Sequence, residues 1–261
     1  HAFEECSGAI SAPRYFAKIA GKTLARRRTK AGIPVLTKTF VDHVPVGVVG
    51  VVTPWNYPLA LTMLDVVPAL VAGNAVVQKA DNQTALTVLF ARHLAIEAGI
   101  PDDLWQVVVG DGELVGNALV DHVDYVAFTG STATGRRVAQ RAAGRLIGCS
   151  LELGGKNPMI VLRGANLKKA AEMAVAGAFG SAGQLCVSIE RVYVPDELKA
   201  DFITADGAGD AGDGADEGGF ESDLAPDVGS FRAQGSAESD LAATFDDVEQ
   251  CRARDCDGAD E

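Results

Sequence analysis

The stretch that decides the fold is VGVVGVV at residues 46–52, followed directly by TPWNYP at residues 53–58. A continuous apolar run of this length, without alternating polar side chains, is typical of a strand buried on both faces of a parallel sheet. Residues 59–74 (LALTMLDVVPALVAGN) predict a helix closed by its Gly-Asn end, and residues 75–80 (AVVQKA) predict a second strand. This order of elements predicts a βαβ unit.

The same alternation continues along the chain. We predict helices over 84–99, 113–120 and 131–144, and strands over 105–110, 123–130 and 146–155. An amphipathic helix is predicted over 1–30, with Arg26-Arg27-Arg28 as its solvated end. PDELKADFI at 195–203 predicts the start of a further helix. The elements together indicate the α/β class with a mainly parallel sheet.

Composition argues against several classes of protein. No apolar run reaches the roughly 20 residues that span a bilayer, and the first residues lack the pattern of a signal peptide. The five cysteines are spaced irregularly, a pattern that fits neither a disulfide framework nor paired metal ligands. The sequence contains no basic patch with interleaved aromatic residues that would indicate binding of nucleic acid. We therefore expect a cytoplasmic protein with no membrane or nucleic-acid partner and no metal.

The net charge of −12 is concentrated at one end of the chain. Residues 204–261 hold 17 acidic residues against three arginines and no lysine, whereas the rest of the chain is close to neutral. This segment is rich in Gly, Ala and Asp and poor in apolar residues, so it cannot bury enough surface to offset its ordering entropy. We expect an acidic, disordered tail, and its composition is what a GC-rich gene gives when read in a shifted frame.

Two motifs follow predicted strands and could bind a ligand. In FTGSTATGRRV (128–138), the backbone N–H groups at a helix start could hold a phosphate, although a helix capped by Ser131 explains the same pattern. In TPWNYP, the Asn56 amide lies where open α/β sheets bind ligands and could donate to an oxyanion. An ordinary turn asparagine is the alternative.

Two further motifs carry a carboxylate and a thiol. In LELGGKNP (151–158), Glu152 interrupts an apolar strand, where apolar neighbours would suit it to act as a general base. An exposed carboxylate, or one paired with Lys156, is the alternative. In FGSAGQLCVSIERVYV (179–194), Cys186 is either a nucleophile or a small apolar side chain that fills space.

Taken together and in this order, PWNYP, FTGSTATG, LELGGKNP and FGSAGQLCVSIERVYV resemble the aldehyde dehydrogenase superfamily over about residues 1–203. The segments VPALVAGNAVV and ELGGKNPMIV are similar in sequence to the succinate-semialdehyde dehydrogenase branch of this superfamily. The resemblance implies a Rossmann-like dinucleotide-binding domain with an incomplete catalytic lobe. It also implies NADP or NAD as the cofactor and an aldehyde, with succinate semialdehyde as the best candidate, as the substrate.

The resemblance also implies roles for individual residues. Cys186 becomes the nucleophile that forms a thioester, Glu152 the general base, and Asn56 an oxyanion donor together with the Cys186 backbone N–H. The implied cofactor-binding residues are Thr53, Pro54, Trp55, Asn56, Lys79, Asn82, Gly130, Ser131, Gly135, Leu153 and Gly154.

The chain departs from the family pattern in three places. Asn82 stands where the family has a glutamate that binds the adenosine ribose, and Leu185 precedes the nucleophile where the common signature avoids leucine. Family chains are nearly twice as long, so we expect a chain truncated at both ends. Relatives of full length are expected to be homo-oligomers, whereas this chain lacks the segment that forms their interface.

The expected organisation has four parts. Residues 1–43 form an N-terminal helix and connector, 44–180 the dinucleotide-binding domain, 181–203 the start of the catalytic domain, and 204–261 the non-native tail. Three functions remain open: an aldehyde dehydrogenase, an inert remnant that at best binds a dinucleotide, and an unrelated thiol acyltransferase or esterase. The third lacks a convincing histidine partner for its thiol.

Overall fold

The computed structural model describes residues 2–33 and 36–207. The chain divides into two compact units, one up to Gly154 and the other from Gly155 onward. Each unit is described by itself.

The first unit is built on a five-stranded sheet in the order β5-β4-β3-β6-β7, and every neighbouring pair in it is parallel. Its strands are β3 (Val48–Val52), β4 (Ala75–Lys79), β5 (Trp105–Val108), β6 (Tyr125–Gly130) and β7 (Gly148–Leu153). Since β3 is central and the chain proceeds outward from it on both sides, the order reverses between β3 and β6. This order confirms the predicted α/β fold with a parallel, Rossmann-like sheet.

Helices cover both faces of this sheet. Residues of α2 (Pro58–Val71) and α3 (Ala85–Glu97) share one buried cluster with β3, β4 and β5. Residues of α4 (Gly112–His122) and α5 (Thr132–Gly144) share a second cluster with β6 and β7. The central strand is therefore buried on both faces, as its continuous apolar sequence predicts.

The turns that start the central strand depend on glycine. Gly47 has φ +120°, and a Cβ there would lie 2.3 Å from a carboxylate oxygen of Asp124, which accepts a hydrogen bond from Val48 N (2.8 Å). A side chain at position 47 would be both strained and blocked. At the other side, Asn74 Oδ1 accepts from the Val46 (2.7 Å) and Gly47 (3.2 Å) amides, which ties the end of α2 to the start of β3.

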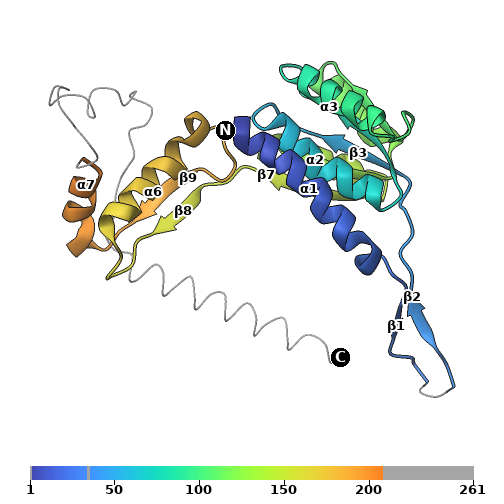
Figure 1. The fold of residues 1–261 in the computed structure, drawn as a ribbon, viewed down its shortest axis with the longest axis horizontal. Helices are drawn as coiled ribbons and strands as arrows, with labels where there is room; N and C mark the ends of the chain where they lie inside the picture. Colours follow the sequence, from blue (N-terminus) through green and yellow to red (C-terminus); the bar gives the residue numbers. More distant parts are fainter. Residues whose placement is uncertain (1, 34–35, 208–261) are drawn as a thin grey trace. The chain divides into compact units, whose positions relative to one another are not determined.

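The N-terminal segment differs from its prediction. Helix α1 runs over Ala2–Thr23 and lies along α2, and the chain then forms a hairpin of β1 (Arg27–Thr29) and β2 (Thr39–Val41) (Figure 1). The predicted helix over 1–30 is thus wrong beyond residue 23. The Arg26 guanidinium lies 4.2 Å from the centre of the Phe40 ring and 3.4 Å from an Asp42 carboxylate oxygen, contacts that fix the arginines to the hairpin.

The second unit is a small βαβ arrangement (Figure 1). Strands β8 (Asn157–Ile160) and β9 (Ile189–Tyr193) pair in parallel, and α6 (Leu167–Phe179) and the 3₁₀ turn η1 (Gly180–Gly183) connect them. The turn η2 (Asp196–Leu198) and helix α7 (Lys199–Gly207) follow and confirm the helix predicted from 195–203.

Two features of the structure concern the expected organisation of the chain. The compact units divide after Gly154, where the large sheet ends and β8 begins a second sheet with β9, whereas the sequence predicts that the dinucleotide-binding domain continues to residue 180. Residues 204–207 belong to α7 and not to a disordered tail. The remainder of the predicted tail, 208–261, lies outside the described residues.

Candidate active site

The carboxyl ends of β3 and β6 flank the point where the strand order reverses, which is where open α/β sheets bind ligands. Residues 53–56 follow β3, Lys79 ends β4, Gly130 ends β6 and Leu153 ends β7. The sheet therefore brings the sequence-predicted residues of the first unit to one edge.

A buried polar cluster supports this edge. Gln78 is fully buried in β4, and its amide nitrogen donates to Thr53 Oγ1 (2.9 Å) and Thr62 Oγ1 (2.7 Å). Its amide oxygen accepts from Trp105 Nε1 (3.0 Å). Because Thr53 starts the segment after β3, this cluster fixes the base of the turn that carries Asn56. The sequence prediction did not include Gln78, although an uncharged polar residue in a strand that is otherwise apolar before Lys79 was a signal.

The turn over Pro54–Asn56 leads into α2. Trp55 is exposed at this turn, and Asn56 is half-buried. The N-cap residue of α2, Tyr57, makes no side-chain capping bond; instead Glu5 of α1 accepts from the Leu59 (2.5 Å) and Ala60 (3.3 Å) amides. A carboxylate from another helix thus caps α2, and its negative charge interacts favourably with the positive end of the α2 dipole.

Lys79 is a buried cation without an anionic partner among the residues that the structure describes. Its side chain is 6% exposed and Nζ donates to Asn82 Oδ1 at 3.5 Å. The same Asn82 oxygen accepts from the Gly110 amide at 3.1 Å. A buried cation is costly unless an anion or several acceptors balance it, so this position suits an anionic or polyhydroxyl ligand.

The start of α5 has the features of an anion site. Ser131 is its N-cap, and Ser131 Oγ accepts from Thr134 N at 3.3 Å. No acidic residue lies in the first turn, and Arg136 and Arg137 are exposed one turn further along the helix. At Gly130 a Cβ would lie 2.7 Å from the Phe128 ring, so only glycine fits before the cap. The backbone N–H groups at this helix start can donate hydrogen bonds to a phosphate.

Gly135 and Leu153 are a packing pair between α5 and β7. A Cβ on the buried Gly135 would lie 2.5 Å from Leu153 Cδ2. The glycine therefore allows α5 to approach the strand closely. This packing sets the position of the start of α5 relative to Leu153 and Gly154. Gly135 has no side chain and that of Leu153 is apolar, so neither residue offers a polar side-chain group to a ligand.

Glu152 lies on the edge strand β7, opposite Thr129 of β6. Its side chain is exposed, so the apolar surroundings expected from the sequence are absent. Lys156, the alternative partner considered from the sequence, forms an ion pair with Glu190 within the second unit. Among the described residues, no cation or hydrogen-bond donor contacts the Glu152 carboxylate.

The perturbed carboxyl is instead Asp65, which the sequence prediction missed. Asp65 is half-buried on α2, and no described residue pairs with its carboxylate. Burial, with a smaller contribution from the Glu152 charge, raises the pKa of Asp65 from 3.8 to about 6. Asp65 is therefore a carboxyl that is more readily protonated than usual, chiefly because α2 packs against the sheet.

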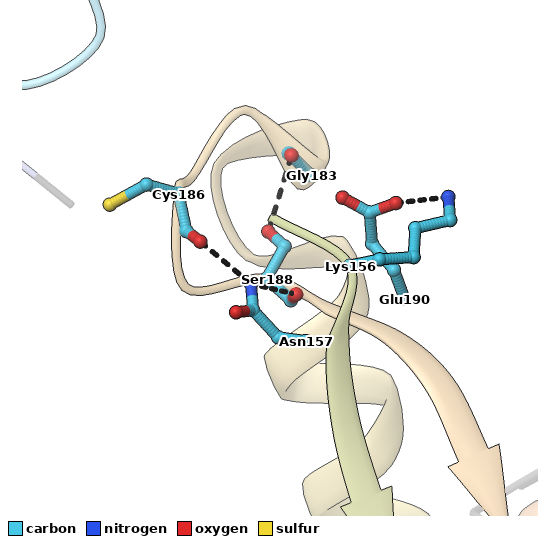
Figure 2. A network of polar contacts seen from close by, with 6 residues as sticks. All are labelled: Lys156, Asn157, Gly183, Cys186, Ser188 and Glu190. Atoms are coloured by element: carbon cyan, nitrogen blue, oxygen red, sulfur yellow. Dashed lines mark hydrogen bonds and ion pairs between the residues drawn. The ribbon is translucent and has the colours of Figure 1, made fainter. Parts of the chain in front are cut away.

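Cys186 belongs to the second unit, in a turn that precedes β9. Ser188 N donates to Leu185 O (3.1 Å) and closes the turn, and Ser188 Oγ donates to Gly183 O (3.2 Å). The thiol is exposed, and Figure 2 shows its sulfur directed away from the hydrogen-bonded network. No described acceptor takes the Cys186 backbone N–H. The structure thus assigns Cys186 an accessible position and not the buried one of a space-filling side chain.

Comparison with known proteins decides the family. Residues 1–207 match the model of the aldehyde dehydrogenase family. The chain belongs to this family. Membership removes the unrelated acyltransferase or esterase from the functions that the sequence left open.

The chain is similar to both curated and solved relatives. It is 55% identical over 192 residues to a Mycolicibacterium smegmatis protein named "Putative succinate-semialdehyde dehydrogenase (NADP+)", with 74% of this chain and 37% of the relative covered. The crystal structure of an NADP-dependent E. coli enzyme superposes with a TM-score of 0.75 at 37% identity, covering 78% of this chain and 42% of that one. The structure of PnpE in complex with nicotinamide adenine dinucleotide gives 0.73 at 34% identity, covering 77% and 41%.

The chain spans about 37% of the length of its curated M. smegmatis relative. Within the part that the structure describes, no helix has both the length and the apolar character needed to cross a bilayer.

Proposed function

We propose that the chain carries the cofactor-binding domain and the nucleophile of an aldehyde dehydrogenase that uses NADP or NAD to oxidise succinate semialdehyde to the acid. The observation that carries the proposal is the exposed Cys186 thiol on a tethered turn of a chain from this family. The substrate is inferred from the name of the relative that is 55% identical.

Cys186 performs the covalent step. Its thiolate attacks the aldehyde carbon and forms a thiohemiacetal, whose oxygen carries the developing charge. The backbone N–H of Cys186, which has no acceptor among the described residues, and the Asn56 amide are the proposed donors to this oxygen. Glu152 removes a proton from the water that hydrolyses the resulting thioester, which releases the acid and restores the thiol. Its exposed carboxylate suits contact with water.

The residues of the first unit fit a dinucleotide. The buried Lys79 cation, the acid-free start of α5 and the glycine before it suit the phosphates and ribose of such a ligand. Bound to these residues, such a dinucleotide would supply the oxidant of the reaction, a nicotinamide that can take up the hydride from the thiohemiacetal carbon and so allow the thioester to form. The adjacent Asn82 carries no charge that would repel a 2′-phosphate, so we infer that NADP is accepted at least as well as NAD.

An inert chain that only binds a dinucleotide stays the second candidate, which the sequence left open. The three described cysteines, Cys6, Cys149 and Cys186, are free thiols, which supports a reducing cytoplasm as the proposed location.

A homo-oligomeric state of full-length relatives stays a prediction.

The test uses the complete 261-residue chain with succinate semialdehyde and either cofactor. We expect formation of reduced cofactor, and we expect Cys186→Ala to abolish it while binding of the cofactor, measured by calorimetry, is retained. Cys6→Ala is the matched control, because Cys6 is an exposed thiol on α1, and it should leave turnover unchanged. Binding without turnover in the wild-type chain would favour the inert candidate, and absence of both would contradict the proposal.

A further inference from the structure

Asn157 is a polar residue that the catalytic scheme leaves unused, yet its side chain is bound to the nucleophile's turn. Asn157 Nδ2 donates to Cys186 O (2.6 Å) and to Ser188 O (2.9 Å), as Figure 2 shows. We propose that Asn157 is a positioning residue, whose amide holds the turn so that the Cys186 thiol and backbone N–H remain available to the same substrate carbonyl. This inference rests on the proposed function.

An irregular strand pair explains how Asn157 reaches the turn. Asn157 pairs with Ile189, whereas the next residue, Pro158, pairs with Arg191, so Glu190 is the extra residue of a β-bulge. The Glu190 carboxylate forms an ion pair with Lys156, the residue before Asn157 (Figure 2). Bulges redirect side chains and are over-represented next to active sites. Here the bulge and the ion pair fix the strand end from which Asn157 extends to the turn.

The segment before the turn needs such a restraint. Ser181 and Ala182 have φ of +54° and +57°, a left-handed conformation that residues with a Cβ rarely adopt, and Gly183 follows with +72°. Strained residues persist only where their surroundings hold them. Ser188 is 2% exposed and its hydroxyl donates to Gly183 O, so the tether from Asn157 to Ser188 O restrains this segment as well.

The amide chemistry of Asn157 matches its task. Its NH₂ group has two N–H bonds, and two carbonyl oxygens, which can only accept, lie within hydrogen-bond distance of it. Serine would supply one donor, and leucine, of similar size, none. Asparagine, serine and leucine at position 157 therefore form a series that can donate two, one and no hydrogen bonds to the turn.

The first measurement is hydrogen exchange of residues 183–188 in the complete chain, followed by mass spectrometry. We expect exchange at least about tenfold faster in Asn157→Leu and an intermediate rate in Asn157→Ser, because the turn opens more often as tethers are lost. The matched control is Asn166→Asp in the same unit. Asn166 is the N-cap of α6, and aspartate caps equally well, so no change is expected. Unchanged exchange in Asn157→Leu would overturn the proposal.

The second measurement separates positioning from folding. In acylation by p-nitrophenyl acetate, the Cys186 sulfur forms a bond to the acyl carbon and p-nitrophenolate leaves with its electron pair. This step creates an oxyanion, whereas alkylation by iodoacetamide does not. We expect Asn157→Leu to lower the acylation rate at least about tenfold and to change the alkylation rate less than about threefold. An equal fall in both rates, or no fall in acylation, would contradict a positioning role.

The two measurements keep the hypotheses apart. Absence of Cys186 acylation in the wild-type chain would count against the proposed function, whereas exchange still decides whether Asn157 holds the turn. Acylation that is unaffected by Asn157→Leu would leave the proposed function intact and refute the role of Asn157.

Discussion

Replacing Asp65 by asparagine should stabilise the first unit at neutral pH. The Asp65 carboxyl is half-buried on α2 and has no partner among the described residues, so burial, with a smaller contribution from the Glu152 charge, disfavours its charged form. Asparagine is nearly the same size and carries no charge. The substitution therefore removes the unfavourable charge without creating a cavity.

The pH dependence follows from the direction of the pKa change. The folded chain binds the proton more tightly, with a pKa of about 6 against 3.8 in the reference state. The Asp65 contribution to stability therefore falls as pH rises from about 4 to about 6 and stays low above that range. A change of this size corresponds to about 3 kcal/mol. Because the side chain is partly exposed, we expect Asp65→Asn to raise the free energy of unfolding by on the order of 1–2 kcal/mol at pH 7.5 and by almost nothing at pH 4.

Urea denaturation followed by tryptophan fluorescence is the assay, because both tryptophans, Trp55 and Trp105, lie in the first unit. The difference between variant and wild type at each pH cancels the titration of the other carboxyls. Asp111→Asn is the matched control: Asp111 is an exposed N-cap that asparagine replaces well, so its effect should be small at both pH values. A stability gain from Asp65→Asn that is equal at pH 4 and 7.5, or a loss at pH 7.5, would refute the reasoning.

Three further outcomes follow from the site. Iodoacetamide should label Cys186 faster than Cys6 or Cys149, as peptide mass spectrometry would show, since a reactive thiol needs exposure and a stabilised thiolate; equal labelling contradicts its role as nucleophile. Asn82→Glu should shift cofactor preference toward NAD in binding titrations, and a wild-type preference for NAD of about tenfold or more, about 1.4 kcal/mol, would contradict this. Gln78→Ala should lower the free energy of unfolding by about 2–4 kcal/mol in urea titrations, because three buried polar partners lose their hydrogen bonds; a loss below about 1 kcal/mol would show that the cluster is not stabilising.

Local patterns were sufficient to predict the large sheet. The strand over 46–52, the strand over 75–80 and the helix between them were located within a few residues, because a continuous apolar run such as 46–52 is a strong local signal of a strand buried on both faces. Helix α5 was predicted to start at residue 131, and Ser131 is its N-cap, since the capping signal is also local. The hairpin of β1 and β2 was missed, because each strand has only three residues and its stability comes from pairing between segments separated by a loop.

The site was only partly predictable, for the same reason. The sequence placed the unusual carboxyl at Glu152 because apolar residues flank it along the strand. However, alternate residues of an edge strand point to opposite faces, so flanking residues do not bury it. Asp65 lies in an equally apolar stretch, but α2 packs on the sheet, and its burial depends on that packing and not on its neighbours in sequence.

Asn157 extends this argument to the nucleophile. It lies within LELGGKNP, a motif in which the sequence singled out other residues but not Asn157, and it is 29 positions before Cys186, whose carbonyl it binds. The contact requires both the parallel pairing of β8 with β9 and the bulge at Glu190, neither of which leaves a periodic signal in sequence. Sequence could therefore single out the thiol as chemically unusual, whereas the residue that holds its turn could be found only once the register of the two strands was known.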